Sequence, residues 1–224
     1  MKLSVIMPVY NEANTVAVAI KRVLAVPSVH QLLAVDDGST DKSIAMMKTI
    51  SHPKLTILKH KQNKGKGTCI KTALAAITGD YVIINDADLE YDPADYQIMR
   101  EPVKSGKAEV VYGSRFKGSH SNMFYWHYLG NRFLNFCINF LFNTTLSDME
   151  SCYKLIPAKI LKSLSLSSPG FGFEPEVTCQ LLKKGIHIYE VPISYSGRGY
   201  EDGKKLHWLH GISAAAIIIK ERLT

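Results

Sequence analysis

Two carboxylates separated by a single residue, Asp86 and Asp88, directly follow a short apolar run at residues 81–84. Carboxylates at this spacing can hold one divalent cation and leave coordination positions open for diphosphate oxygens, and Mg²⁺ and Mn²⁺ prefer such oxygen ligands. Glu90, two residues further on, can add a third ligand. In a second interpretation, which is compatible with the first, Asp88 and Glu90 cap the helix that starts near Pro93. The spacing predicts a divalent-cation site.

A second acidic group, Asp-Asp-Gly-Ser at residues 36–39, follows another apolar run at residues 32–35. An acidic side chain at the end of a strand in an α/β sheet can accept hydrogen bonds from a ribose or a base. The alternative is a turn followed by a helix, with Ser39 or Asp41 as the N-cap residue. The sequence leaves both interpretations open.

Basic residues accompany these acidic groups. Residues 63–67, Asn-Lys-Gly-Lys-Gly, precede a helix, and exposed amides at a helix N-terminus suit an anionic phosphate group. The motif is not a Walker loop, and its lysines have solubility as an alternative role. Arg115 follows an apolar strand at residues 109–112, and its guanidinium fork suits phosphate. An ion pair of Arg115 with Asp86 or Asp148 is the structural alternative.

The elements around these residues alternate between strands and helices. Apolar runs predict strands, and apolar residues at helical spacing predict the helices between them. Such alternation indicates an α/β fold with a mostly parallel, doubly wound sheet. Right-handed crossovers place the strand-to-helix loops at one edge, where ligands bind in such folds. Residues 8–12, 36–39 and 86–88 are therefore expected to converge. The strands are expected at residues 3–9, 32–35, 55–58 and 81–84, and the helices at residues 15–26, 41–50 and 67–77.

The pattern changes after residue 113. Residues 124–142 form a helical pattern with eight aromatic side chains and Arg132. Further helices are expected from Pro157, over residues 174–184 and over residues 206–222, with a strand at residues 186–191. Because no Pro- or Ser-rich linker and no repeat interrupts the chain, we expect one domain spanning residues 1–224.

Composition limits the class of protein. Hydrophobic residues make up 46% and charged residues 21% of 224 residues, which argues against disorder, collagen and coiled coil. The net charge of +7 favours anionic partners such as phosphates or an anionic membrane face. No nucleic-acid-binding motif appears, so nucleic acid is not expected as a partner. The four cysteines form no Cys-x-x-Cys pair, which indicates reduced thiols. The N-terminus is too short for a secretion signal, and no run of about 18 apolar residues predicts a membrane span.

Five short motifs occur in order along the chain, and together they resemble the family 2 glycosyltransferases with the GT-A fold. They are residues 8–12 (Pro-Val-Tyr-Asn-Glu), 35–39 (Val-Asp-Asp-Gly-Ser), 63–67, 86–88 and 113–115 (Gly-Ser-Arg). A late loop with Arg198 and Lys204 is similar to that of the dolichyl- or polyprenyl-phosphate sugar synthases. The resemblance covers about residues 3–210, and it is the ordered set rather than any single motif that is specific.

The resemblance implies a role for each matching position. The nucleotide base and ribose would be lined by Pro8, Tyr10, Glu12, Val35 and Asp37. The diphosphate would face Asp86, Ala87 and Asp88, and the Mg²⁺ or Mn²⁺ ion would be held by Asp86, Asp88 and Glu90. Relatives often have Gln or Ser in place of Glu90. Lys66, Arg198 and Lys204 would bind donor phosphates, and Arg115 and Arg132 the acceptor phosphate. The residues implied in catalysis are Asp88, Arg115 and Asp148.

The implied reaction is an inverting transfer of a sugar from a GDP-mannose or UDP-glucose type of donor to a polyprenyl or dolichyl phosphate. Residues 1–115 would bind the nucleotide sugar, and residues 116–224 would face the acceptor. A phosphate monoester has a second pKa near ~6, so it is largely dianionic at neutral pH and needs no general base. Asp148 is the candidate if a base exists, and orienting Arg115 or the acceptor is its alternative role.

The aromatic helix at residues 124–142 suits a position in the membrane interface, or else in the core or a dimer contact. The basic charge favours peripheral attachment to the cytoplasmic face of a membrane. A homo-oligomer is compatible with the sequence. Two other functions stay open: a soluble glycosyltransferase that acts on a sugar hydroxyl of a glycan, and a non-catalytic subunit that binds nucleotide sugars.

Overall fold

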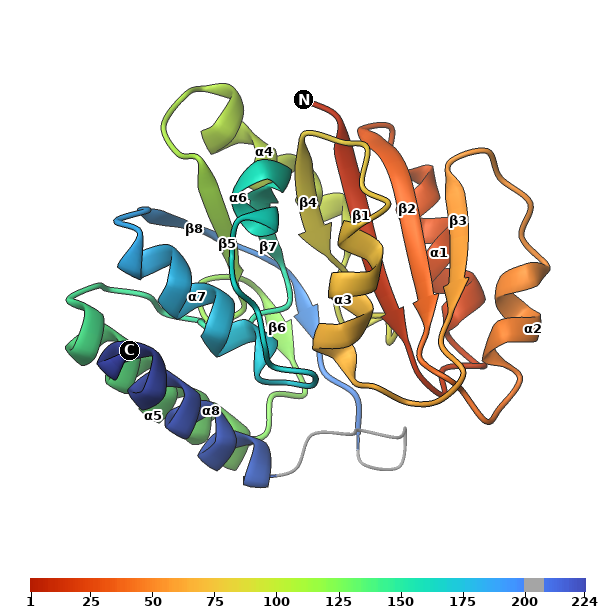
Figure 1. Cartoon of the computed structure of the whole chain (residues 1–224). Helices are drawn as coiled ribbons and strands as arrows, with labels where there is room; N and C mark the ends of the chain where they lie inside the picture. Colours follow the sequence, from red (N-terminus) through yellow and green to blue (C-terminus); the bar gives the residue numbers. More distant parts are fainter. Residues whose placement is uncertain (200–207) are drawn as a thin grey trace.

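A seven-stranded sheet lies at the centre of the computed structural model, which describes residues 1–199 and 208–224 (Figure 1). Its strand order is β3-β2-β1-β4-β7-β5-β8, and within it β7 runs antiparallel to its neighbours β4 and β5. The other pairs are parallel, so the expected α/β class with a mostly parallel sheet is confirmed. The strands are β1 (Leu3–Val9), β2 (Val29–Asp36), β3 (Leu55–Lys59), β4 (Tyr81–Ile84), β5 (Val110–Ser114), β7 (Lys154–Pro157) and β8 (Ile188–Pro192).

Helices cover both faces of this sheet. In Figure 1, α3 (Lys66–Leu74) lies in front of the central strands and α1 (Val16–Ala25) lies behind them. The apolar stripe expected on α1 is buried, because Val16, Ile20 and Val23 have no exposed surface. The remaining helices near this half are the short α2 (Ser43–Lys48) and α4 (Tyr96–Lys104), and α4 follows a 3₁₀ turn at Pro93–Asp95.

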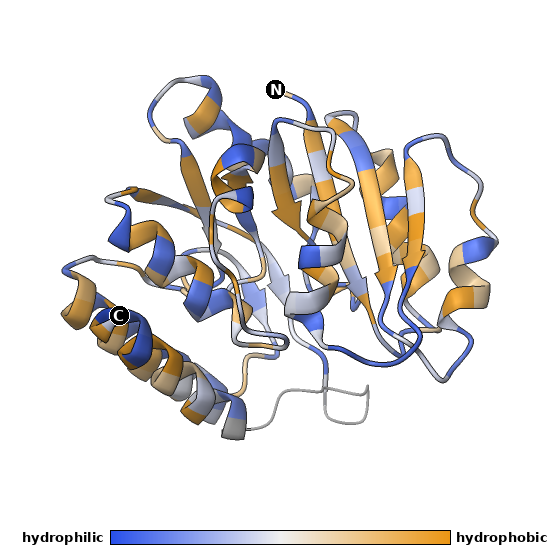
Figure 2. Cartoon of the chain, in the orientation of Figure 1, coloured by the Kyte–Doolittle hydropathy of each residue, from blue (hydrophilic) through white to orange (hydrophobic). Residues whose placement is uncertain are grey.

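The C-terminal part adds a layer of helices beside the sheet. Helices α5 (Tyr125–Phe142) and α8 (Trp208–Leu223) lie side by side, and α7 (Phe173–Lys183) packs against both (Figure 1). A small second core fills the space between them, formed by Leu134, Ile138, Met149, Cys179, Ala214 and Ile218. Figure 2 shows hydrophobic residues both on the central strands and along the α5–α8 pair. The other elements are α6 (Ala158–Lys162) and the two-stranded pair of β6 (His120–Ser121) and β9 (Tyr195–Ser196).

The structure agrees with most expected elements within a few residues, including the strands at Leu3–Val9 and Tyr81–Ile84. Strand β7 was not predicted. It enters the middle of the sheet from the acceptor-side half, so its hydrogen bonds join the two halves that the sequence separates. Among the described residues, no helix is long and apolar enough to cross a membrane. The single-domain assignment stays a prediction.

Candidate active site

A cavity of about 710 Å³ opens at the carboxyl ends of β1, β2, β4 and β5, and we call it the edge cavity. The three loops expected to converge do line it, through Glu12, Asp37 and Asp88. Side-chain hydrogen bonds fix two of these loops against each other. The Asn11 side chain accepts from Thr40 N–H, and Ser43 Oγ accepts from Glu12 N–H at 2.7 Å. The sheet topology therefore brings distant segments together at the carboxyl ends of the strands, where ligands bind in α/β sheets.

The loop after β4 presents its acidic side chains to the edge cavity by means of an unusual backbone conformation. Leu89 has φ +65°, a left-handed conformation that costs a side chain of this type energy. This turn lets both Asp88 and Glu90 line the cavity. Such strain persists where the surrounding structure holds it, and it is concentrated at functional sites.

Carboxylate repulsion is strong at Asp88. Burial raises the pKa of the Asp88 carboxyl, the negative charges of Asp86 and Glu90 raise it further, and Arg198 opposes them. Hard oxygen ligands with excess negative charge are the donor set that Mg²⁺ and Mn²⁺ bind. Among the described residues, the ion-pair contact of Asp88 Oδ2 is a long one, 3.6 Å from Arg198 Nη2. The site therefore fits a divalent cation, with Asp88 as its best placed ligand.

Arg198 lies among the acidic side chains of the edge cavity. Its guanidinium donates to Glu12 at 3.0 and 3.1 Å, and its backbone N–H donates to Glu90 Oε1 at 2.9 Å. Glu90 also accepts from Tyr195 Oη at 2.7 Å, so this carboxylate already organises the segment around β9. The Arg198 guanidinium therefore partly neutralises the carboxylates of Glu12 and Glu90. Lys204, the other basic residue expected in this loop, lies outside the described residues.

Lys66 connects the acidic loop to α7. Its ammonium lies 2.8 Å from Asp86 Oδ1 and 2.8 Å from Glu174 Oε1. Burial alone lowers the pKa of Lys66, but Asp86, Cys152 and Glu174 outweigh this effect and raise it well above its usual value. Lys66 therefore places a positive charge beside Asp86 in the edge cavity. It begins α3 after Gly65, whose φ of +89° and close approach to Pro169 exclude a side chain.

Asp148 is committed to Arg115. The Asp148 carboxylate, which is fully buried, accepts from Arg115 backbone N–H and Nε at 2.8 Å and from Nη2 at 2.7 Å. Burial lowers the pKa of Arg115, but Asp148 outweighs that and raises it well above its usual value. A carboxylate with both oxygens engaged is poorly placed to take a proton. This geometry supports the orienting role of Asp148 over the role of a base.

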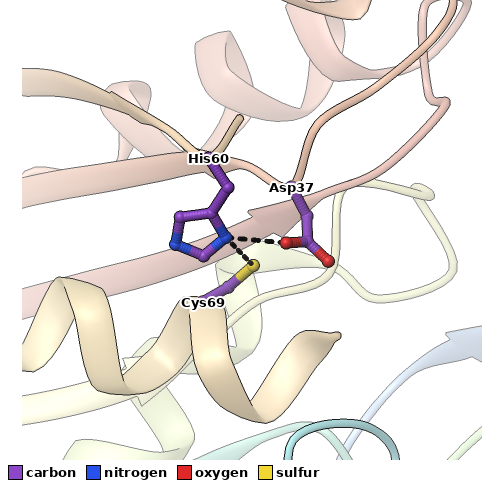
Figure 3. A group of neighbouring side chains, drawn as sticks. All are labelled: Asp37, His60 and Cys69. Atoms are coloured by element: carbon purple, nitrogen blue, oxygen red, sulfur yellow. Dashed lines mark hydrogen bonds and ion pairs between the residues drawn. The ribbon is translucent and has the colours of Figure 1, made fainter. Parts of the chain in front are cut away.

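Asp37 is held in a buried hydrogen-bonded group with His60 and Cys69 (Figure 3). Its carboxylate lies 2.7 Å from His60 Nδ1 and accepts from the backbone N–H groups of Lys64 and Gly65 at 2.9 and 2.7 Å. The ligand atoms of Asp37, His60 and Cys69 lie within 4.8 Å of one another, so the group is a candidate metal site by distance. However, two ligands of one tetrahedral Zn²⁺ ion lie roughly 3.3 Å apart, so the shorter separation indicates a hydrogen bond.

The remaining expected residues divide into two groups. Pro8, Tyr10 and Ala87 line the edge cavity. Val35 does not, because its side chain lies in the core with no exposed surface. Arg132 is exposed on α5 and does not line the cavity. Trp126, His127, Gly130 and Asn131 of the same helix do line it. The roles assigned to all these positions stay predictions.

Two acidic residues of the edge cavity were not singled out from the sequence. Glu150 precedes β7 and Glu174 lies in the first turn of α7, and both line the cavity. Glu174 is only 3% exposed, and a carboxylate so deeply buried is normally paired, as Glu174 is with Lys66. Its place in an apolar helix start next to Phe173 was an available signal. No sequence signal marked Glu150, because its burial depends on the long-range insertion of β7 between β4 and β5.

These features define an α/β protein with the GT-A architecture and an acidic cavity at the carboxyl edge of its mostly parallel sheet. Residues 4–165 match the model of glycosyl transferase family 2, and the chain belongs to that family. Similarity to solved structures agrees with the fold. Glucosyl-3-phosphoglycerate synthase from Mycobacterium tuberculosis, solved with Mn²⁺, UDP and phosphoglyceric acid, superposes with a TM-score of 0.78 at 18% identity, over 99% of this chain and 78% of that one.

Curated relatives are similar over most of this chain. The hexosyltransferase Agl6 of low-salt glycan biosynthesis, from Haloferax volcanii, is 30% identical over 202 residues, which are 88% of this chain and 48% of that protein. Glycosyltransferase AglJ from the same organism is 28% identical over 87% of this chain and 63% of its own length. Polyprenol monophosphomannose synthase from Mycolicibacterium smegmatis is 28% identical over 87% of this chain and 77% of its own length. The chain therefore spans about half to three quarters of these relatives.

Proposed function

We propose that this chain is a metal-dependent hexosyltransferase that moves a sugar from a nucleoside diphosphate donor to a polyprenyl-type lipid phosphate. The donor part of the proposal is supported by the family and by the acidic edge cavity. Asp88 and its neighbours would hold Mg²⁺ or Mn²⁺, which supplies positive charge to the leaving diphosphate. Lys66 and Arg198, which lie at 2.8 to 3.1 Å from the acidic loops, add fixed positive charge at the same place.

The acceptor part rests on one observation, a stripe of exposed apolar side chains on α5 that begins at the edge cavity. Trp126 both lines the cavity and is 76% exposed. Residues at spacings of three and four continue the stripe along one face of the helix, which is the arrangement of an interfacial helix. We call this set the α5 stripe: Trp126, Leu129, Phe133, Phe136 and Phe140. A lipid chain that leaves the cavity at Trp126 would meet an apolar surface.

A bilayer surface, rather than a second copy of the chain, suits the charges around the α5 stripe. Helix α8 packs beside α5 and carries the exposed apolar residues Ile212 and Ile219. Its last turn holds Lys220 and Arg222, and the Arg222 guanidinium lies 5.7 Å from the Phe142 ring. Apolar residues bordered by cations are typical of helices that lie in an anionic headgroup layer. The polyprenol-phosphate relative at 28% identity points to the same acceptor class.

The available catalytic groups also favour a phosphate over a hydroxyl acceptor. A hydroxyl acceptor requires a general base, and the buried Asp148 carboxylate is engaged by Arg115 through both oxygens. A phosphate dianion requires none. Arg115 would then bind the acceptor phosphate or the departing charge, with Asp148 fixing the direction of its guanidinium.

The test is transfer from radiolabelled UDP-glucose, GDP-mannose or UDP-N-acetylglucosamine, with Mn²⁺ or Mg²⁺, to a polyprenyl monophosphate. The matched control acceptor is the polyprenol of the same length without its phosphate. We expect product from the phosphate acceptor alone, and only with a divalent cation. Equal transfer to the polyprenol or to a soluble sugar would contradict the lipid-phosphate assignment, and no turnover of any donor would favour a non-catalytic binding subunit.

A further inference from the structure

Two acidic side chains in the wall of the edge cavity have an oxygen that lacks a hydrogen-bond partner among the described residues. They are Glu150, through Oε1, and Glu174, through Oε2, and both oxygens are hidden from bulk solvent. A buried carboxylate oxygen without a partner costs free energy, so such groups usually have a ligand or a function. The other oxygen of Glu174 is engaged by Lys66, which also holds Asp86.

The backbone on both sides of Glu150 is rigidly held. Lys154, which is fully buried over the Tyr112 ring, donates from its ammonium to the carbonyl oxygens of Met149 and Ser151. Met149 N–H donates to Asn135 Oδ1 of α5 at 2.8 Å. The protein thus fixes the backbone around Glu150 while Glu150 Oε1 has no hydrogen-bond partner among the described residues, as expected for a residue that is preorganised for a ligand.

The surroundings of Glu150 favour a hydroxyl group as that ligand. Burial raises the pKa of the Glu150 carboxyl and the charge of Glu174 raises it further; Lys154 and Arg115 oppose this, and Asp148 adds to it. A carboxyl that keeps its proton both donates and accepts a hydrogen bond, which matches a sugar hydroxyl, whereas the negative charge of Glu174 would repel a phosphate. For phosphate groups, the same cavity offers the cationic side chains of Lys66, Arg115 and Arg198.

We propose that Glu150, with the unpartnered oxygen of Glu174, binds hydroxyl groups of the hexose that is transferred, and that this pair selects among donor sugars. The pair is linked through Lys66 to Asp86, so it lies next to the position proposed for the diphosphate, where the sugar of the donor must begin. This inference rests on the proposed nucleotide-sugar donor. It assigns Glu150 to substrate binding, and no proton transfer is required of it.

The experiment measures equilibrium binding with Mn²⁺ and without acceptor, so that turnover does not enter. Calorimetry compares the tightest binder among UDP-glucose, GDP-mannose and UDP-N-acetylglucosamine with its own nucleoside diphosphate. In Glu150→Ala we expect the affinity for the nucleotide sugar to fall about tenfold, or about 1.4 kcal/mol, with the affinity for the diphosphate unchanged within about twofold. Glu150→Gln keeps a hydrogen-bond donor and an acceptor, so its affinity for the nucleotide sugar should lie between those of the wild type and Glu150→Ala.

The control is Glu101→Gln, a carboxylate on α4 whose side chain is 57% exposed and pairs with Lys104. It should bind both ligands as the wild type does. A second readout uses donors that lack one sugar hydroxyl. The wild type should lose affinity for one of them, and Glu150→Ala should no longer distinguish that donor from the parent.

The outcomes separate this inference from the proposed function. A parallel fall in both affinities would mean that Glu150 only supports the fold, and no change in either would mean that it does not touch the sugar; each overturns the inference. If none of the three nucleotide sugars binds the wild type, the proposed donor class is wrong and the inference falls with it. A thermal melt of each variant identifies loss of folding, and Glu150→Gln then carries the comparison.

Discussion

At the level of single residues, the acidic loop after β4 concentrates negative charge that the protein alone only partly neutralises. Asp88 is the clearest case, because burial and the charges of Asp86 and Glu90 raise the pKa of its carboxyl. The repulsion destabilises the ligand-free protein and becomes attraction when a divalent cation binds. Affinity for the cation and low stability without it therefore have the same origin.

Asp88→Asn should lower metal-dependent transfer by about 100-fold or more, because the mutant loses a charged ligand where negative charge develops. It should not lower the melting temperature measured in EDTA, since a neutral amide relieves the repulsion at Asp88. Steady-state kinetics and thermal melts measure the two effects. Wild-type turnover in this variant would refute the metal role of Asp88, and a collapse of stability in EDTA would refute the electrostatic argument.

Asp148→Asn should act through Arg115. Removing one partner of a buried ion pair leaves the other uncompensated and costs about 3 kcal/mol of unfolding free energy. We expect the KM for the lipid phosphate to rise, because Arg115 loses its fixed direction. Denaturant unfolding and kinetics over a range of pH provide the measurement. A kcat that falls several thousandfold, with loss of the acid limb of the pH–rate profile, would instead identify Asp148 as the base.

The sequence indicated Asp86, Asp88 and Arg115 as candidate site residues because each follows an apolar strand. In a mostly parallel sheet, the topology brings such strand ends together. The sequence also offered an ion pair of Arg115 with Asp86 or Asp148 as an alternative, and the structure confirms the pair with Asp148. The sequence could not choose between the two partners, because Asp148 lies 33 positions from Arg115 along the chain. His60 was also missed. Its hydrogen bond to Asp37 follows from the pairing of β2 with β3, in which Asp36 lies opposite Lys59, and no local pattern reports it.

At the level of elements, β7 shows where local patterns fail. Residues 154–157, Lys-Leu-Ile-Pro, are too short for a period, and the lysine suggests an exposed position. In the structure all four are buried between β4 and β5, with Lys154 satisfied by carbonyl oxygens of the preceding loop. Antiparallel insertion into a parallel sheet is a long-range event, so propensity cannot predict it. The helices were predictable because their apolar spacing is a local property.

The outward face of α5 leads to a prediction about membrane attachment. Phe136 and Phe140 are 64% and 75% exposed, and their rings stack 6.1 Å apart. Burying one such side chain contributes about 2 kcal/mol, so the double variant Phe136→Ser/Phe140→Ser should bind phosphatidylglycerol vesicles at least about tenfold more weakly. Sedimentation with vesicles measures this, and phosphatidylcholine vesicles test the contribution of charge.

The matched control for the α5 stripe is Ile98→Ser, which changes an exposed apolar residue on α4. It should bind vesicles as the wild type does. Donor binding should be unchanged in both variants, because neither Phe136 nor Phe140 lines the edge cavity. If the double variant binds vesicles normally but changes the sedimentation coefficient of the free protein, the α5 stripe is a contact between copies of the chain.

At the level of the whole molecule, a basic protein of net charge +7 contains an acidic site. The edge cavity is lined by more carboxylates than cationic side chains: Glu12, Asp37, Asp86, Asp88, Glu90, Glu150 and Glu174 against Lys66, Arg115 and Arg198. The overall field attracts anions, and the local field attracts a cation. A nucleotide sugar bound to a divalent cation would be attracted by both fields: its phosphates by the overall positive charge and its cation by the acidic cavity. The nucleotide sugar and the cation should therefore bind together.

The nucleotide and the divalent cation should therefore bind cooperatively, and the melting temperature should report this. At about 100 times its dissociation constant, a ligand stabilises the folded state by about 2.7 kcal/mol, which raises the melting temperature of a chain of this size by about 5 °C or more. We expect this shift from nucleoside diphosphate with Mn²⁺, and a much smaller one from either alone, as measured by differential scanning fluorimetry. An equal shift in EDTA would show that the cation takes no part in nucleotide binding.

The position of α5 has a consequence for the choice of lipid. Helix α5 lines the edge cavity with Trp126, and the exposed α5 stripe continues from Trp126 along the same face. If α5 lies in the headgroup layer, as proposed, its depth there sets the height of the edge cavity relative to the bilayer. The phosphate headgroup of the acceptor would reach the edge cavity at that height, whatever the length of its prenyl chain. Prenyl acceptors that differ in their number of isoprene units should then be used at similar rates once each is long enough to anchor.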